Sequence, residues 1–384
     1  MSSRLDFSDI HSEIFNSVHG WAQKYLAPGA AQRDKTATFD REIYQKLDTE
    51  LGIMNITLPE NLNGAGLDIA ATILAIEALS TADPGIAISY LSQELLFTHQ
   101  LYWTWKHENK QIPKEHADIL KKKSISGMAM TEPDAGTDVL AMKTRAKITN
   151  NGFTLNGIKQ WITNGTIGEF FLVYARTGEE RRDISLFLVN ANTPGLTRQP
   201  CDEKMGMRSS PTGILTFQNC TLPASALVGT LHLGLKPMIR NLAVERLGLA
   251  AQSCGIATQC LEIMTAYAAQ RQAFGKNIAQ FGQIQAYIAN SHAQCHAMRA
   301  FLYETTWKVL DNAPDASINA DAVKLFCAKS AESISRNAIQ ILGANGYSNA
   351  YSVERLHRDA ILLSIGGGTN EALEKNITRL LTKL

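Results

Sequence analysis

One carboxylate in the chain has surroundings that suit acid–base chemistry. Glu245 stands beside Arg246 in the apolar run LAVERLGLAA, residues 242–251. A helix that buries the leucines of this run would carry Glu245 toward a low-dielectric interior, where an acid has a raised proton affinity and can act as a base. The alternative is an exposed charge pair on an ordinary amphipathic helix, and the remaining motifs of the chain decide against it.

A second candidate segment lies near the end of the chain, where the sequence GGGTNE occupies residues 366–371. Its Thr369 and Glu371 open the last predicted helix, and the free N–H groups at a helix start suit a phosphate or a polar ring edge. A flexible turn would explain the three glycines, but it would not explain the Thr-x-Glu that follows them.

Length and composition exclude several classes of protein. The 384 residues suffice for two or three domains, and a net charge of +1 gives no general affinity for nucleic acid or membranes. No apolar stretch reaches the roughly 18 residues of a membrane span, and the N-terminus lacks the apolar core of a signal peptide. The six cysteines have no metal-site spacing, so no metal is expected. We therefore predict a cytoplasmic protein without membrane insertion or nucleic-acid binding.

The periodicity of apolar residues divides the chain into three parts. It indicates a helical bundle over residues 1–123, a middle antiparallel β-domain over residues 124–232, and a four-helix bundle over residues 233–384. The four long helices are expected near 235–270, 281–311, 318–343 and 369–383. The predicted class is α+β with several domains, and the lack of alternating βα units or of GxGxxG after a strand argues against a dinucleotide-binding sheet.

Seven motifs in this order and spacing resemble the acyl-CoA dehydrogenase family, over essentially the whole chain. They are MTEPDAGTD at 130–138, WITNG at 161–165, MGMRSS at 205–210, ERL at 245–247, RQAFGK at 271–276, QILG at 340–343 and GGGTNE at 366–371. The resemblance implies that family's three-part fold, FAD as cofactor and a homo-oligomer, a tetramer in most members.

The resemblance also implies which residues of the middle domain contact the flavin. Met128, Met130 and Thr131 would lie against the ring, and Trp161 and Thr163 would cover its N5 side. Without the neighbouring motif, Trp161 would be taken for a core tryptophan. The hydroxyl of Thr137, where the family usually has serine, would contact the pyrophosphate or the thioester arm.

A second set of cofactor contacts is implied for a neighbouring subunit. Arg271 matches the arginine that reaches the FAD pyrophosphate, a pairing that a guanidinium fork suits. Phe274 would pack near the adenosine. The segment that holds the adenine includes Gln340, Gly343 and Ala344.

The resemblance places the base at Glu245. Many family members carry a glutamate where this chain has Gly367, and a minority, similar to isovaleryl- and long-chain acyl-CoA dehydrogenases, carry it in the ERL sequence. Glu245 would remove the α-proton of a thioester while FAD takes the β-hydride. The N–H of Gly367 would still polarise the thioester carbonyl, and Arg246 would contact the pantetheine or phosphate arm.

One departure from the family pattern leaves the carrier of the acyl group open. The position two before the base is often acidic and helps bind the CoA arm, but here it is Ala243. An acyl or aminoacyl group, such as prolyl, on a phosphopantetheine carrier protein is the alternative to a CoA ester. The electron acceptor is either an electron-transfer flavoprotein or oxygen. A non-catalytic flavoprotein of the same fold is the second alternative, and the placement of Glu245 opposes it.

Overall fold

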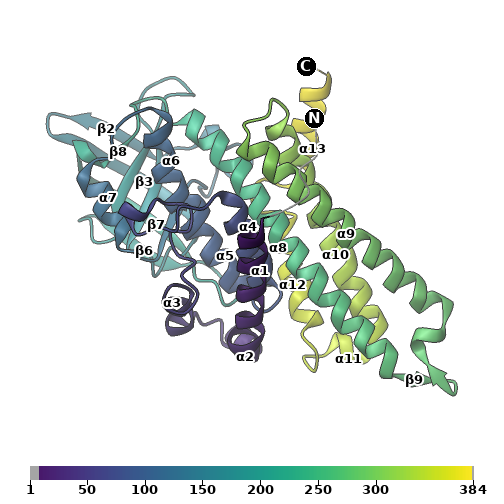
Figure 1. The fold of residues 1–384 in the computed structure, drawn as a ribbon. Coiled ribbons are helices and arrows are strands. Elements are labelled where there is room, and N and C mark those ends of the chain that lie inside the picture. The colour runs from purple at the N-terminus through teal and green to yellow at the C-terminus, as the bar shows by residue number, and fades with distance from the viewer. Residues whose placement is uncertain (1–7, 383–384) are drawn as a thin grey trace.

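The computed structural model describes residues 8–382 and shows three parts in chain order (Figure 1). Helices come first, a β-sheet follows, and long helices complete the chain, which confirms the predicted architecture. Helix α7 ends at Lys121, strand β1 begins at Ser126 and helix α8 begins at Leu235. Residues 1–7 and 383–384 of the predicted outer domains lie outside the described residues. Within the described part, no helix is long and apolar enough to cross a membrane.

The N-terminal part is a set of short helices around the buried helix α4. Aspartates cap two of them: the Asp68 carboxylate accepts the Ala70 N–H at 2.9 Å, and the Asp83 carboxylate accepts the Gly85 N–H at 3.1 Å. The elements are α1 (Asp9–Trp21), η1 (Ala22–Leu26), α2 (Ala27–Thr36), α3 (Arg41–Thr49), η2 (Glu60–Leu62), α4 (Ile69–Ser80), α5 (Pro84–Leu91), η3 (Ser92–His99), α6 (Gln100–His107) and α7 (Lys114–Lys121).

The middle part is one sheet with strand order β6-β7-β3-β2-β4-β5-β8, and β1 also pairs with β4. The strands are β1 (Ser126–Ala129), β2 (Arg145–Thr149), β3 (Gly152–Thr163), β4 (Phe170–Arg176), β5 (Ile184–Asn190), β6 (Leu196–Pro200), β7 (Thr212–Pro223) and β8 (Leu227–Val228), with short helices η4 (Val139–Ala141) and η5 (Ala224–Ala226). Most pairs are antiparallel, as expected, but β1 and β2 pair with β4 in parallel. The sheet is therefore mixed, because the β2–β3 hairpin separates β1 from β4 in the chain and allows a crossover connection.

Strand β4 is buried on both faces, and this decides where its side chains point. Leu172 and Tyr174 pack with the helices, whereas Phe171 and Val173 belong to a separate core within the β-domain. Successive side chains of a strand point to opposite faces, so the two cores share one strand. Tyr174 consequently lies on the face of the sheet that is turned toward the helices.

The C-terminal part is built around α8, which at 36 residues is about 54 Å long. Its elements are α8 (Leu235–Gln270), β9 (Gln272–Ala273), β10 (Lys276–Asn277), η6 (Ile278–Gln280), α9 (Gly282–Leu310), α10 (Ala316–Leu342), α11 (Ala344–Tyr347), α12 (Val353–Leu363) and α13 (Asn370–Thr382). The four expected long helices are α8, α9, α10 and α13. The shorter α12 was not anticipated.

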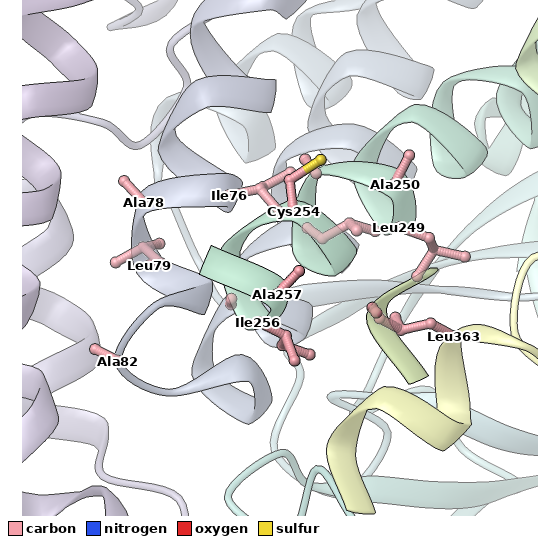
Figure 2. Close-up of a cluster of buried hydrophobic side chains, with 14 of the residues drawn as sticks. Ile76, Ala78, Leu79, Ala82, Leu249, Ala250, Cys254, Ile256, Ala257 and Leu363 are labelled. Atoms are coloured by element: carbon pink, nitrogen blue, oxygen red, sulfur yellow. The ribbon is translucent and has the colours of Figure 1, made fainter. Parts of the chain in front are cut away.

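The middle of α8 joins the two helical parts in one apolar core. Figure 2 shows Leu249 and Cys254 of α8 between Ile76 of α4 and Leu363 of α12. This core fixes the segment of α8 that carries Glu245 relative to the loop that follows α12.

Candidate active site

Glu245 lies in the N-terminal half of α8, and one of its carboxylate oxygens is buried without a hydrogen bond among the described residues. Its Oε2 atom is buried and has no hydrogen-bond partner among the described residues, although the residue as a whole keeps some exposure. Burial raises the pKa of Glu245 to about 7, against the opposing effect of the positive charges of Arg246 and Lys324. A carboxyl group with this pKa is suited to accept a proton near neutral pH.

Gly367 brings the backbone of the α12–α13 loop next to Glu245. Its φ is +63°, and a Cβ atom built on it would lie 3.7 Å from the Glu245 carboxyl carbon. The same Cβ atom would lie only 2.5 Å from Cδ1 of Leu249. Glycine therefore permits both the left-handed backbone and the close approach at this point.

Two cationic side chains hold the carbonyl groups of this loop. Arg246 donates from Nε to the Gly367 carbonyl at 3.1 Å, and its Nη1 atom pairs with Asp321 of α10. Lys324 of α10 donates to the Gly368 carbonyl at 2.8 Å and contacts Oδ1 of Asn370 at 3.3 Å. Arg246 is thus engaged inside the protein, and its contact with the substrate arm stays a prediction.

Lys324 and Asp321 were missed in the sequence. Both side chains are buried, at 0% and 2% exposure, in the run ADAVKLFCA of α10. The available signal was two charges three residues apart inside an otherwise apolar helical segment, which usually indicates a buried ion pair or a functional site.

The loop continues into α13, where Thr369 and Glu371 are found. The Thr369 hydroxyl accepts the Ala372 N–H at 3.3 Å and so caps this helix. Hydrogen bonds from its own N–H and from Thr369 lower the pKa of Glu371, whose side chain is exposed. Both residues are near Gly367 in the chain, and the Glu371 side chain is exposed whereas Thr369 is half-buried.

A flat aromatic surface stands at the end of strand β3. Trp161 has φ +61° and is 50% exposed, at an irregularity in the β3–β7 pairing. Thr163 follows on the same strand, while Met128 lies in β1 and Met130 and Thr131 follow that strand. The Gln160 N–H donates to the Thr131 carbonyl at 2.9 Å, so the backbone just before Trp161 lies beside the segment that follows β1. An exposed indole at such a strand end fits an isoalloxazine ring, which needs a flat apolar contact and polar edge partners.

We call Met128, Met130, Thr131, Trp161 and Thr163 the flavin platform. A buried ion pair contacts its backbone at Met130. Lys159 is fully buried and donates to the Met130 carbonyl and to Oε1 of Glu132, each at 2.8 Å. Glu132 also accepts the Thr144 N–H at 3.0 Å. The glutamate of the TEP sequence is therefore a structural residue, and Thr137, further along the same segment, is exposed.

Asn241 and Tyr174 are two further polar residues near Glu245 that sequence reasoning missed. Asn241 precedes Glu245 by one helical turn, and its Nδ2 donates to Sδ of Met128 at 3.0 Å. Tyr174 is fully buried, and burial together with the Glu245 charge raises its pKa.

The remaining predicted cofactor residues lie at the other end of α8. Arg271 follows that helix directly, and Phe274 is 95% exposed in the β9–β10 hairpin. At 1.5 Å per residue, the 26 steps from Glu245 to Arg271 correspond to about 39 Å. The exposed residues Gln340, Gly343 and Ala344 lie where α10 ends and α11 begins, which Figure 1 places at the same lower end of the bundle. The structure does not bring this distal group to Glu245 within one chain.

A pocket of about 920 Å³ lies along the N-terminal half of α8. Ala243, Lys236 and Arg240 line it from α8, and Trp103 lines it from α6. The Arg240 guanidinium lies 5.5 Å from the Trp103 ring centre, and its Nε and Nη1 atoms are buried without a hydrogen-bond partner among the described residues. The described residues contain no cluster of ligands for a metal ion.

Comparison with known families identifies the fold as a whole. Three models match in succession: the acyl-CoA dehydrogenase N-terminal domain at residues 8–112, the middle domain at 127–220 and the C-terminal domain at 232–382. The chain belongs to the acyl-CoA dehydrogenase family. The resemblance seen in the sequence is confirmed, and with it FAD as the family cofactor and an oxidoreductase activity on CH–CH bonds.

Relatives and solved structures match along the full chain. The mitochondrial isovaleryl-CoA dehydrogenase of Oryza sativa subsp. japonica is 34% identical, over 100% of this chain and 93% of its own. The structure of butyryl-CoA dehydrogenase from Megasphaera elsdenii has a TM-score of 0.93 at 31% identity and covers 98% of this chain and 99% of its own. The FAD complex of PigA has a TM-score of 0.90 at 27% identity, covering 98% of both chains.

Proposed function

We propose that this acyl-CoA dehydrogenase homologue oxidises an acyl thioester to its α,β-enoyl thioester with Glu245 as the base. The observation that carries the proposal is the position of Glu245, a carboxyl group with a raised pKa beside the backbone of Gly367. Gly367 has no side chain to serve as a base, so Glu245 is the carboxylate available at this place.

Glu245 and Gly367 have separate roles in the proposed reaction. Glu245 accepts the α-proton, and the electron pair of that C–H bond forms the new double bond as the β-hydride leaves. The Gly367 N–H donates to the thioester oxygen and stabilises the negative charge that develops there. Arg246 and Lys324 donate to the Gly367 and Gly368 carbonyls, which restrains the loop that carries this N–H. The acceptor for this hydride would be supplied by FAD when it is bound.

The platform of the β-domain would hold the flavin ring of that FAD. Met128, Met130 and Thr131 supply one edge, and Trp161 and Thr163 supply the flat contact. The Thr137 hydroxyl and the free N–H groups at the start of α13, where Thr369 and Glu371 lie, would bind the phosphate or a polar ring edge of the cofactor.

The adenosine half of the same FAD requires a second chain. Arg271 lies about 39 Å along α8 from the base, too far to complete the same site from within the chain. The β9–β10 hairpin with Phe274 and the start of α11, with Gln340 and Gly343 before it and Ala344 in it, lie at that same end of the bundle (Figure 1). We propose a homotetramer in which each FAD is shared by two subunits.

The basic pocket beside α8 is our candidate for the anionic arm of the thioester. Its wall includes Ala243, two residues before Glu245, together with the guanidinium group of Arg240. A phosphate suits such a group. A CoA ester is the first candidate, and an acyl or aminoacyl group on a phosphopantetheine carrier protein is the second, because Ala243 replaces an acidic contact to CoA.

Anaerobic titration of the FAD-loaded protein tests the proposal. A panel of acyl-CoAs is added first, then acyl- and prolyl-loaded carrier proteins, and the loss of oxidised flavin absorbance reports hydride transfer. Reduction by a thioester with formation of the enoyl product supports the proposal, and the effective carrier identifies the substrate arm. A flavin that no thioester reduces would favour the non-catalytic alternative. Reoxidation by an electron-transfer flavoprotein or by oxygen then identifies the acceptor.

A further inference from the structure

Asp321 of α10 holds the arginine that follows the base in the chain. Its side chain is 2% exposed, and its Oδ1 atom pairs with Nη1 of Arg246. From Nε the same guanidinium group donates to the Gly367 carbonyl at 3.1 Å. Arg246 therefore connects a buried carboxylate to the glycine whose N–H we assign to the thioester oxygen.

The same carboxylate connects α10 to the helix that follows the α12–α13 loop. The Asn376 side chain of α13 donates a hydrogen bond to Asp321. Three residues further along α10, Lys324 donates to the Gly368 carbonyl at 2.8 Å. The loop is thus restrained by contacts that start from one turn of α10 and reach both α8 and α13.

Charged and titratable groups reach Glu245 from three elements. Arg246 of α8 and Lys324 of α10 lower its pKa. On strand β4, the buried phenol of Tyr174 is affected by the charge of Glu245. The α12–α13 loop adds no side chain at Gly367, so two positive charges dominate the electrostatics around the base.

Asp321 opposes these two cations. It pairs with Arg246 directly, and its charge raises the pKa of Lys324, as does that of Glu371 on α13. Burial raises the pKa of Asp321, whereas the charge of Arg246 favours its ionised form. An ionised Asp321 offsets part of the positive charge near Glu245, and a carboxyl group in less positive surroundings is a stronger base.

We infer that Asp321 is a positioning residue of the proposed reaction: through Arg246 it restrains the Gly367 backbone, and it offsets the positive charge beside Glu245. This inference rests on the proposed function, since it concerns the proton transfer to Glu245. The alternative is an ion pair that only fastens α10 to α8. An amide at position 321 distinguishes the two, because it keeps the shape of the carboxylate but loses its charge.

Anaerobic reduction of the FAD-loaded protein, followed by stopped flow from about pH 5 to 9, compares Asp321→Asn with the wild type. The thioester is the one that reduces the wild-type flavin fastest. The maximal rate should fall by about tenfold or more, because the restraint on Gly367 weakens and Glu245 becomes a weaker base. The rate should also rise at a lower pH than in the wild type, because the charge of Arg246 is no longer offset. The half-saturating thioester concentration should change by less than about twofold, since Arg246 is engaged within the protein.

Asp83→Asn is the matched control. Asp83 is also 2% exposed and also pairs with an arginine, because its Oδ2 atom accepts from Nε of Arg33 at 2.9 Å. It caps α5 in the N-terminal part of the chain. Its replacement should lower the melting temperature but leave the maximal rate within about twofold of the wild type and the pH profile unmoved.

Two further variants test whether Asp321 acts through Arg246 and through its charge. In an Arg246→Met background, Asp321→Asn should slow the reaction by less than about twofold more, because the pair is already broken. Asp321→Glu keeps the charge, so it should retain the wild-type pH profile while its rate is only partly restored. This variant also tests the charge if Asp321→Asn fails to fold, and melting temperatures with FAD content reveal such a failure.

Several outcomes would overturn the inference. They are a wild-type rate in Asp321→Asn, a slower rate with an unmoved pH profile, and a full additional loss in the Arg246→Met background. The first two would leave the pair as a fastening between helices, and the third would remove the route through Arg246. If no thioester reduces the flavin of the wild-type protein, the proposed function itself is wrong, and Asp321 has no reaction to serve.

Discussion

Gly367 and Glu245 lie so close together that one carbon atom added to Gly367 would contact the Glu245 side chain. A Cβ atom on Gly367 would lie 3.7 Å from both Cγ and Cδ of Glu245. A carboxylate carried at either position would therefore reach the same region of space. This relationship gives a physical reason why a glutamate in either of these two distant segments of the chain could act at the same place.

Moving the carboxylate to position 367 should restore part of the activity. In a Glu245→Gly background, Gly367→Glu would recover a measurable fraction of flavin reduction, because both positions border the same site. The recovery is limited by the left-handed backbone of Gly367 and by Leu249, whose Cδ1 would lie 2.5 Å from the new Cβ atom. Adding Leu249→Val should increase the recovered rate. If neither the double variant nor the triple variant recovers flavin reduction, the two positions do not border the same site. Glu245→Gly alone is the control.

Removing the base without changing its shape should abolish the chemistry while leaving the cofactor in place. Glu245→Gln is expected to keep FAD at wild-type stoichiometry and to slow anaerobic flavin reduction by about 10² to 10⁴-fold, the usual contribution of a general base. Stopped-flow absorbance of the flavin measures the rate. A glutamine variant that reduces its flavin at the wild-type rate would remove Glu245 from this role.

The pH dependence should show the titration of Glu245. Because burial raises its pKa to about 7 and the base must be ionised, kcat/KM should rise with pH up to about 7 and level off above it. The free energy of unfolding depends on this pKa in the opposite direction. Between pH 4.5 and 7 the folded carboxyl group holds a proton that the unfolded one has lost. The free energy of unfolding of the wild-type protein therefore falls with rising pH relative to that of Glu245→Gln. A kcat/KM that is flat from pH 5 to 8 would contradict this assignment.

Much of the fold could be predicted because its signals are local. The Asn151-Gly152 turn marks the β2–β3 hairpin, and long apolar periodicity marks α8, α9 and α10. The parallel pairing of β1 with β4 could not be predicted, because β1 has only four residues and its partner is more than 40 residues away. Such a pairing depends on tertiary contacts that leave no local pattern.

The candidate site was predictable where residue types are unusual and not where they are common. An acid in an apolar run and a triple glycine drew attention to Glu245 and Gly367, and the structure brings them together. Lys324 and Lys159 were overlooked because a lysine in a helix or strand usually lies at the surface. Their burial becomes evident only when the backbone carbonyls that they bind are in place.

Breaking the ion pair behind the flavin platform should destabilise the protein and weaken cofactor binding. Lys159→Met leaves Glu132 buried without its partner, a loss that typically costs about 3–5 kcal/mol, and frees the Met130 carbonyl. Chemical denaturation and FAD content are the measurements. Lys143→Met is the control, because Lys143 is 73% exposed in its pair with Asp134 and its removal should cost about 1 kcal/mol or less. Equal effects of both variants would show that the buried pair has no special part in holding the platform.

Lys324 should influence both the rate and its pH dependence. Lys324→Met removes the donor to the Gly368 carbonyl, so the loop that carries the Gly367 N–H loses a restraint and the maximal rate of flavin reduction should fall by about tenfold or more. It also removes a positive charge that lowers the pKa of Glu245, so the rising part of the pH–rate profile should move to higher pH.

Lys324→Arg should restore the pH at which the rate rises more fully than the rate itself, because arginine keeps the positive charge but not the geometry of the hydrogen bond to Gly368. Lys329→Met, an exposed lysine on the same helix that pairs with Glu374, is the matched control and should change neither. A lower rate with an unmoved profile would mean that Lys324 only holds the loop and does not act on Glu245.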